Sequence, residues 1–179
     1  REDMPPQSNF WQYRILSGGK VWIVSKLMPD LYTFSPKPDV FFTPSHYVPP
    51  LSPVDRVCSI MDLGYLKFSE QFKAYDFWQL KLWSAYSLIV SNHIIAISQK
   101  TKDDIVRHYS FASRKLHVTP LAYDKEKFNL SIKEKDVRRV KEKYSIVKQY
   151  LLYLGTLKPS KNIDGLIDAW GTVYQKFPD

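Results

Sequence analysis

Short apolar runs recur along the first two thirds of the chain, and each of them ends at a polar or turn-forming residue. Continuous apolar runs of four to six residues are typical of strands that are buried on both faces of a parallel sheet. The predicted strands are residues 40–43, 56–61, 93–98 and 115–119. A further segment, 20–25, follows a Ser-Gly-Gly turn and fits either a short strand or the start of a helix.

Helical patterns separate several of these strands. Apolar residues recur at helical spacing over 70–90, with no proline or glycine inside, which predicts a long helix. Ser98 is a suitable N-cap for a second helix, whose first turns carry Asp103 and Asp104. Helical crossovers imply parallel strand pairing. The sequence therefore predicts an α/β fold with an incomplete Rossmann-like parallel sheet and helices on both faces.

The pattern restarts after a strongly basic segment. Residues 132–148 hold seven basic and three acidic side chains and predict an amphipathic helix, with Val137, Val140 and Tyr144 facing inward. Residues 150–154 then predict a fifth buried strand, and residues 163–177 an amphipathic helix. One strand and one helix cannot bury both faces of a parallel strand. This last unit is therefore the end of the first sheet or the beginning of a second domain, and the intervening basic helix favours the second interpretation.

Composition excludes several classes of protein and favours a globular one. With 179 residues and 44% apolar content the chain can bury a core, so global disorder is excluded. The net charge of +8 favours anionic partners. The single cysteine, Cys58, lies in an apolar run and predicts a buried structural thiol, without a disulfide or zinc site. No apolar stretch is long enough to span a bilayer, which predicts a protein of a reducing, cytoplasmic compartment.

One candidate site follows the predicted fifth strand. Gly155 ends that strand, and the chain then turns into a helix, whose unpaired N-terminal amides favour a phosphate. Lys161 adds a full positive charge at this helix start, and Asn162 either caps the helix or donates a hydrogen bond. The alternative interpretation is an ordinary loop that faces solvent. The spacing is not that of a P-loop.

A second candidate site lies where the first two strands end. His46 follows the first strand, and Asp62 follows the second. Ligands of open α/β sheets bind at the carboxyl ends of the strands, so these side chains are candidates for hydroxyl recognition or proton transfer. The alternatives are a loop-capping carboxylate for Asp62 and a loop hydrogen-bonding role for His46. No pair of histidines or carboxylates has the spacing of a metal-binding motif, so a metal site is not expected. Nucleic-acid binding is disfavoured because the aromatic residues fall mainly at core positions.

Five consecutive segments in this order resemble the family-four, or group 1, glycosyltransferases. They are PDVFFTPSHYVPP (38–50), RVCSIMDLGYL (56–66), HIIAISQKTKDDIVRHY (93–109), KLHVTPLAYDKEKF (115–128) and YLLYLGTLKPSKNIDGLIDAW (150–170). Members of this family are two-domain enzymes of the GT-B fold, which transfer a sugar from a nucleotide-sugar donor to an acceptor. The resemblance implies a GT-B fragment with a saccharide or lipid-linked acceptor, usually retention of anomeric configuration, and no obligatory metal or other cofactor.

The resemblance also implies domains and residue roles. Residues 1–130 correspond to the later part of the acceptor-side domain, 131–149 to a basic linker helix, and 150–179 to the first strand–helix unit of the donor domain. Lys161, with Gly155, Thr156 and Asn162, corresponds to the donor diphosphate end. Asp62, Met61 and His46 line the acceptor-side crevice.

The chain departs from the family pattern at several positions. Thr156 stands where members often carry arginine, and Met61 where they often carry histidine. The loop 120–124 reads PLAYD in place of the usual PNGVD. Neither the family's glycine-rich loop nor its paired-glutamate motif is in this sequence, so we expect an inactive fragment of an enzyme.

These departures leave other functions open. The first alternative is a non-catalytic α/β binding or assembly module that keeps the fold. The basic helix is also a candidate for peripheral contact with the inner face of an anionic membrane. Single-stranded RNA binding is a weaker third interpretation.

Overall fold

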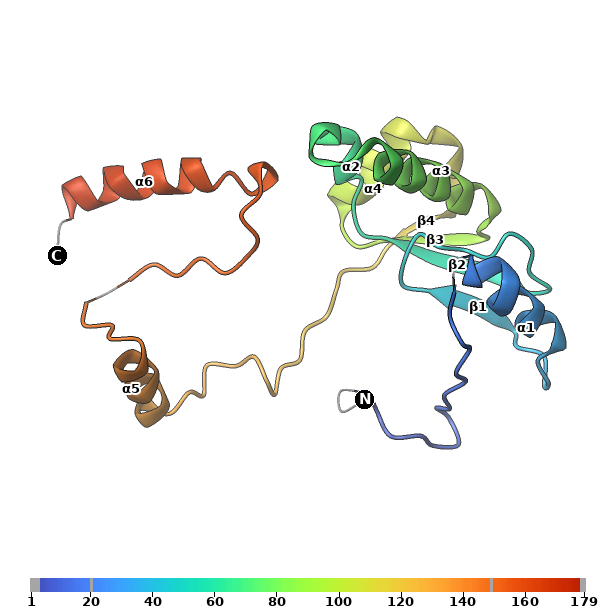
Figure 1. Ribbon diagram of the computed structural model, residues 1–179, viewed down its shortest axis with the longest axis horizontal. Coiled ribbons are helices and arrows are strands. Elements are labelled where there is room, and N and C mark those ends of the chain that lie inside the picture. The colour runs from blue at the N-terminus through green and yellow to red at the C-terminus, as the bar shows by residue number, and fades with distance from the viewer. Residues whose placement is uncertain (1–3, 20, 149, 178–179) are drawn as a thin grey trace. The chain divides into compact units, whose positions relative to one another are not determined.

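The computed structural model describes residues 4–19, 21–148 and 150–177 (Figure 1). The chain divides into two compact units, Arg1–Leu121 and Ala122–Asp179. Each unit is described by itself below.

The first unit is built on a four-stranded parallel sheet in the order β1-β2-β3-β4. Its strands are β1 (Val40–Thr43), β2 (Asp55–Ile60), β3 (His93–Ala96) and β4 (Leu116–Val118). All four strands predicted from apolar runs are present: the first has the predicted ends, and the ends of the other three differ by at most two residues. The predicted α/β class and the Rossmann-like parallel sheet flanked by helices are thereby confirmed.

The helices of this unit are a π-helical turn (Ile23–Leu27), α1 (Met28–Thr33), α2 (Gly64–Lys67), α3 (Ala74–Val90) and α4 (Gln99–His108), with 3-10 turns at Ser69–Gln71 and Ser110–Lys115. Two of them, α3 and α4, were predicted, whereas α1, α2 and the 3-10 turns were not. The segment after the Ser-Gly-Gly turn is helical rather than a strand, and Lys20 lies outside the described residues. Ser98 caps α4 as predicted, because its Oγ accepts a hydrogen bond from the Thr101 amide at 3.1 Å.

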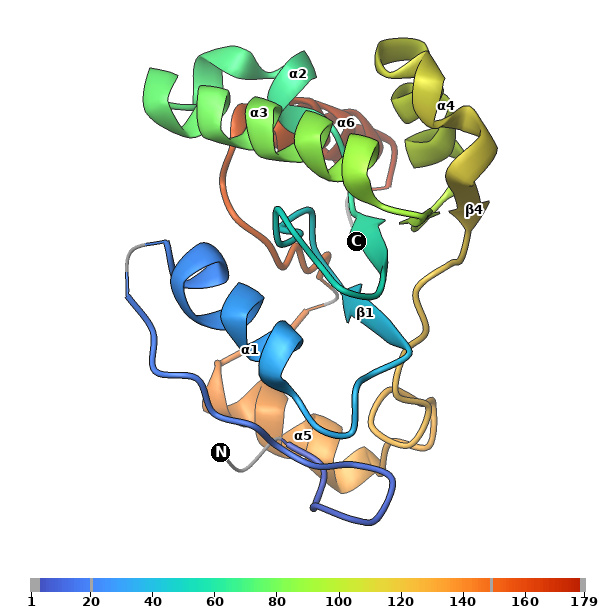
Figure 2. The same ribbon diagram turned by 90° about the vertical axis from the view of Figure 1, so that its right-hand side faces the viewer.

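One face of the sheet forms the core. Cys58, Ile94 and Leu116 are cross-strand partners in one row, so their side chains share a face, and all three are buried. Leu88 of α3 and Ile105 of α4 are fully buried in the same cluster. Figures 1 and 2 show α2, α3 and α4 together on one side of the sheet. The buried position predicted for Cys58 is confirmed.

The opposite face of the sheet is only partly covered. Phe42 is 53% exposed on this face. His93 of β3 and His117 of β4 are also exposed, with 3.2 Å between Nδ1 of His93 and Nε2 of His117.

The second unit contains α5 (Glu134–Lys143), a 3-10 turn (Pro159–Lys161) and α6 (Ile163–Lys176). Both helices were expected from the sequence. The prediction of a strand at 150–154 was wrong, since these residues have no regular secondary structure, and Leu154 is 91% exposed. A parallel strand needs a neighbour for its backbone hydrogen bonds. The described part of this unit contains no second strand to supply them.

The inward orientation expected for the apolar side of the basic helix was also wrong. No described residue of α5 is buried, and Val137 and Val140 are 42% and 44% exposed. Tyr144, just after the helix, is 64% exposed. An apolar stripe becomes buried only where another element packs on it.

Candidate functional site

The carboxyl ends of β1 and β2 bring His46 and Asp62 to the same edge of the sheet, because the two strands are parallel and paired. The His46 ring lies against Tyr47, with 4.1 Å between ring centroids, and its backbone carbonyl accepts a hydrogen bond from the Ser87 hydroxyl. Nε2 of His46 is buried and has no hydrogen-bond partner among the described residues. Burial lowers the pKa of His46, and the nearby Asp62 carboxylate offsets this only in part. His46 is therefore held as a neutral imidazole.

Asp62 has a structural contact of its own. Its Oδ1 accepts a hydrogen bond from the Gly64 amide at 2.7 Å, where α2 begins. This contact is the loop-capping arrangement that the sequence left open as an alternative, although the exposed carboxylate retains a second oxygen for another donor. Met61 is 38% exposed, and its thioether offers only a weak acceptor. His46 and Asp62 thus lie near each other, with Met61 next to Asp62 in the chain. Nε2 of His46 is buried, so the second carboxylate oxygen of Asp62 is the group that remains open to a ligand.

The second candidate site is the turn formed by residues 155–162, which leads into α6. Pro159–Lys161 form a single 3-10 turn, and Asn162 adopts a left-handed conformation with φ 49° and ψ 49°. Asparagine tolerates this region better than most residues. The left-handed residue reverses the chain so that α6 begins directly at Ile163.

The first amides of α6 are free. Among the described residues, no acceptor bonds the amides of Ile163, Asp164 or Gly165, and the Asn162 side chain makes no capping hydrogen bond. Lys161 is exposed and has no ion-pair partner in the described part of the chain. Unpaired amides at a helix N-terminus and an adjacent ammonium group are a favourable environment for an anion. Lys161 and Asn162 thus lie beside donors that a phosphate would satisfy.

Gly155 and Thr156 lie at the other end of this turn and are held by Tyr153. The Tyr153 hydroxyl donates a hydrogen bond to the Thr156 carbonyl at 3.2 Å. The same ring lies over Gly155, where an added Cβ would come within 2.6 Å of the hydroxyl oxygen. A glycine at this position therefore allows the tyrosine to close over the turn. Sequence reasoning assigned Tyr153 to a buried strand and missed this contact.

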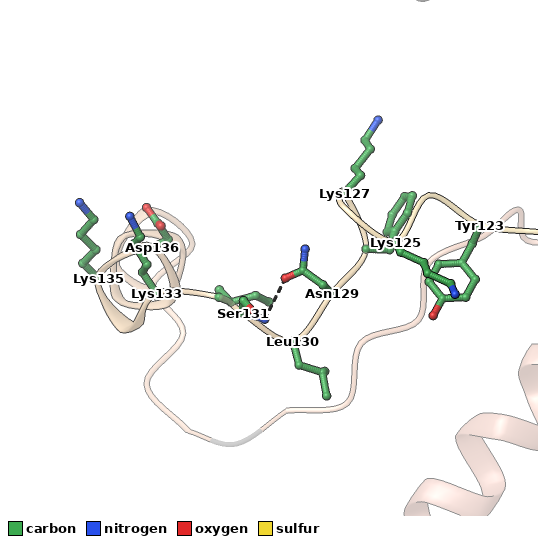
Figure 3. Close-up of a pocket in the computed structure, with 11 residues that line it drawn as sticks. Tyr123, Lys125, Lys127, Asn129, Leu130, Ser131, Lys133, Lys135 and Asp136 are labelled. Carbon is green, nitrogen blue, oxygen red and sulfur yellow. Dashed lines mark hydrogen bonds between the residues drawn. The ribbon is translucent and has the colours of Figure 1, made fainter.

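Two cavities of the second unit are lined by residues other than Gly155, Thr156, Lys161 and Asn162. An apolar groove of about 400 Å³ runs between the 150–153 segment and α6, and it is lined by Tyr150, Leu151, Tyr153, Leu166, Ile167 and Trp170. A larger hollow of about 1150 Å³ follows the loop 123–136. Figure 3 shows that the Tyr123, Lys127 and Leu130 side chains leave this loop in different directions. The Ser131 amide donates a hydrogen bond to Oδ1 of Asn129 at 2.8 Å. The hollow is open and has no convergent set of polar groups.

A cationic pocket in the first unit was not predicted. It lies between α2 and α4 and is lined by Lys67, Lys100 and Arg107, among others. The only sequence signal was the spacing of Lys100, Asp104, Arg107 and His108, which places them on one side of a helix.

The described residues hold neither a metal cluster nor a membrane-spanning helix. They contain no group of three or more histidine, cysteine, aspartate or glutamate side chains able to hold a metal ion. In the same residues, no helix combines the length and the apolar character needed to cross a membrane.

No protein-family model matches this chain, and no curated protein sequence matches it.

Proposed function

We propose that this chain is part of a nucleotide-sugar-dependent glycosyltransferase of the GT-B type, in which the 155–162 turn and the start of α6 bind the donor diphosphate. The single observation that carries the proposal is the set of three unpaired amides at Ile163–Gly165, with the exposed Lys161 beside them. A diphosphate would accept hydrogen bonds from the amides and a charge-assisted contact from the lysine.

The chemistry of sugar transfer gives these groups a role. Negative charge grows on the departing diphosphate in the transition state, so fixed donors that face it stabilise that state more than the ground state. Lys161 supplies the full charge, and the α6 amides supply oriented dipoles. Thr156, where family members often carry arginine, would contribute one charge fewer.

The acceptor would bind at the other candidate site. Asp62, whose second carboxylate oxygen makes no hydrogen bond among the described residues, is suited to accept one from a hydroxyl group of a saccharide or of a lipid-linked sugar. His46 lies beside it with its Nε2 buried, so it would position this part of the site rather than contact the sugar. The proposed transfer proceeds with retention and without a metal. The fully buried Cys58 agrees with a reducing compartment such as the cytoplasm.

A second candidate function is a non-catalytic binding module with the same fold. The specific observation in its favour is that the crevice side chains are partly committed to structure. Asp62 bonds the Gly64 amide, and Met61 offers no hydrogen-bond donor. Such a module would bind a nucleotide diphosphate without transferring a sugar.

Isothermal titration of the 179-residue chain with UDP, GDP and ADP tests the donor-site proposal. We expect Lys161→Ala to weaken the binding of the preferred nucleotide by roughly tenfold or more, since one charge-assisted contact is lost. Lys158→Ala is the matched control, because Lys158 is an exposed lysine of the same turn. Equal affinities for Lys161→Ala and the unaltered chain, or equal losses in the two variants, would contradict the proposal.

A further inference from the structure

A cavity of about 370 Å³ lies between α2 and α4 in the first unit. Four of its residues come from α4, namely Lys100, Asp104, Arg107 and His108, and their spacing places them on one side of that helix. Lys67 joins them from the end of α2. Segments that are more than thirty residues apart in the chain therefore line one cavity.

The lining of this α2–α4 pocket is positively charged. It contains three permanent cations, Lys67, Lys100 and Arg107, and one carboxylate, Asp104. Asp104 is committed to Lys100, with 2.6 Å between Oδ1 and Nζ. The hydrogen bond from Lys100 lowers the pKa of Asp104, which favours the ionised carboxylate. Lys67 and Arg107 have no ion-pair partner among the described residues. The Lys67 ammonium lies 5.3 Å from the centroid of the Phe68 ring, a weaker contact that a phosphate can replace.

The floor of the pocket is apolar. Leu63 is only 6% exposed, and Leu66 is partly buried where it packs on the core. A small cavity with an apolar floor and a few cationic groups is the usual composition of a site for an anion that is attached to a carbon skeleton. The planar guanidinium of Arg107 is suited to bidentate contact with phosphate oxygens.

We propose that the α2–α4 pocket binds a phosphate group, with Arg107 and Lys67 as its principal ligands. None of its lining residues belongs to the donor turn. The phosphate comes either from a lipid headgroup, whose glycerol and acyl portion would contact Leu63 and Leu66, or from free inorganic phosphate. Asp104 competes with the ligand for Lys100 and thus limits its affinity.

The test uses the full chain and two probes in isothermal titration. The probes are inorganic phosphate and dihexanoyl phosphatidic acid below its micelle concentration. We expect Arg107→Gln to weaken phosphate binding by roughly tenfold, and Asp104→Asn to strengthen it. These opposite signs separate a specific site from a general loss of structure.

Lys102→Gln is the matched control, because it removes one positive charge from the same helix at a position that does not line the pocket. Tighter binding of the short-chain lipid would support the site and assign it to a headgroup, whereas similar affinities would support it and assign it to free phosphate. The proposal is overturned if neither probe binds, or if Lys102→Gln and Arg107→Gln weaken binding equally. Thermal unfolding of each variant verifies that the chain remains folded.

Discussion

The hydroxyl of Thr101, in the first turn of α4, donates a hydrogen bond to the backbone carbonyl of Met61 at 3.1 Å. Thr101 is only 7% exposed, so this contact lies in the interior. It connects the helix after β3 to the loop after β2, the loop that also carries Asp62. The position of the crevice residues therefore depends on a contact between segments forty residues apart.

Replacing Thr101 by valine removes this hydrogen bond while keeping the side-chain shape. We expect Thr101→Val to lower the free energy of unfolding by about 1 kcal/mol. The loop 61–64 should also open more often. In the unaltered chain the Gly64 amide donates a hydrogen bond to Asp62, so hydrogen exchange at this amide should be faster in the variant. Thr101→Ser keeps the hydroxyl and should leave this exchange rate close to that of the unaltered chain. An unchanged rate in Thr101→Val would contradict the role given to this contact.

Substitutions at Leu88 and Leu82 test which side of α3 packs on the core. Leu88 is fully buried, while Leu82 on the same helix is 63% exposed. Leu88→Ala should lower the free energy of unfolding by about 2–5 kcal/mol, because it removes packed methyl groups and leaves a cavity. Leu82→Ala should cost about 0.5 kcal/mol or less. Urea unfolding of both variants measures the difference, and similar losses would contradict the packing described here.

Protonation of His46 should lower the free energy of unfolding in mildly acidic solution. Burial lowers the pKa of His46 below its usual value of 6.5, so the unfolded chain binds more protons between the lowered pKa and pH 6.5. This contribution is fully present above pH 6.5 and is lost as the pH falls through the lowered pKa. One proton gives a slope of at most about 1.4 kcal/mol per pH unit.

Urea unfolding between pH 7.5 and 5 measures that dependence. His46→Gln should flatten it, since glutamine does not titrate. The same pH dependence in both chains would show that His46 is hydrated in the folded state.

Much of the secondary structure of the first unit could be predicted because short sequence segments mark its strands and helices. The apolar runs around Cys58 and Ile94 are flanked by turns and separated by helical patterns, so both the strands and their parallel pairing followed. Ser98 could be placed as a cap from its residue type and position alone.

The second unit was harder to predict, because no other element pairs with or packs on its apolar segments among the described residues. The run Tyr150–Leu154 has the same apolar character as β3, but a strand forms only where a neighbour completes its hydrogen bonds. Val137 and Val140 likewise have helical spacing without an element packed on them. The α2–α4 pocket could not be predicted, since Lys67 and Arg107 are brought together by the tertiary fold.

Amide chemical shifts during titration with UDP test the donor-turn proposal most directly. If a diphosphate binds at the start of α6, the backbone amide resonances of Ile163, Asp164 and Gly165 should move further than those of any other segment, and Lys161→Ala should reduce their movement. The account is contradicted if these three resonances stay in place at UDP concentrations that saturate the chain, or if the largest shifts occur elsewhere.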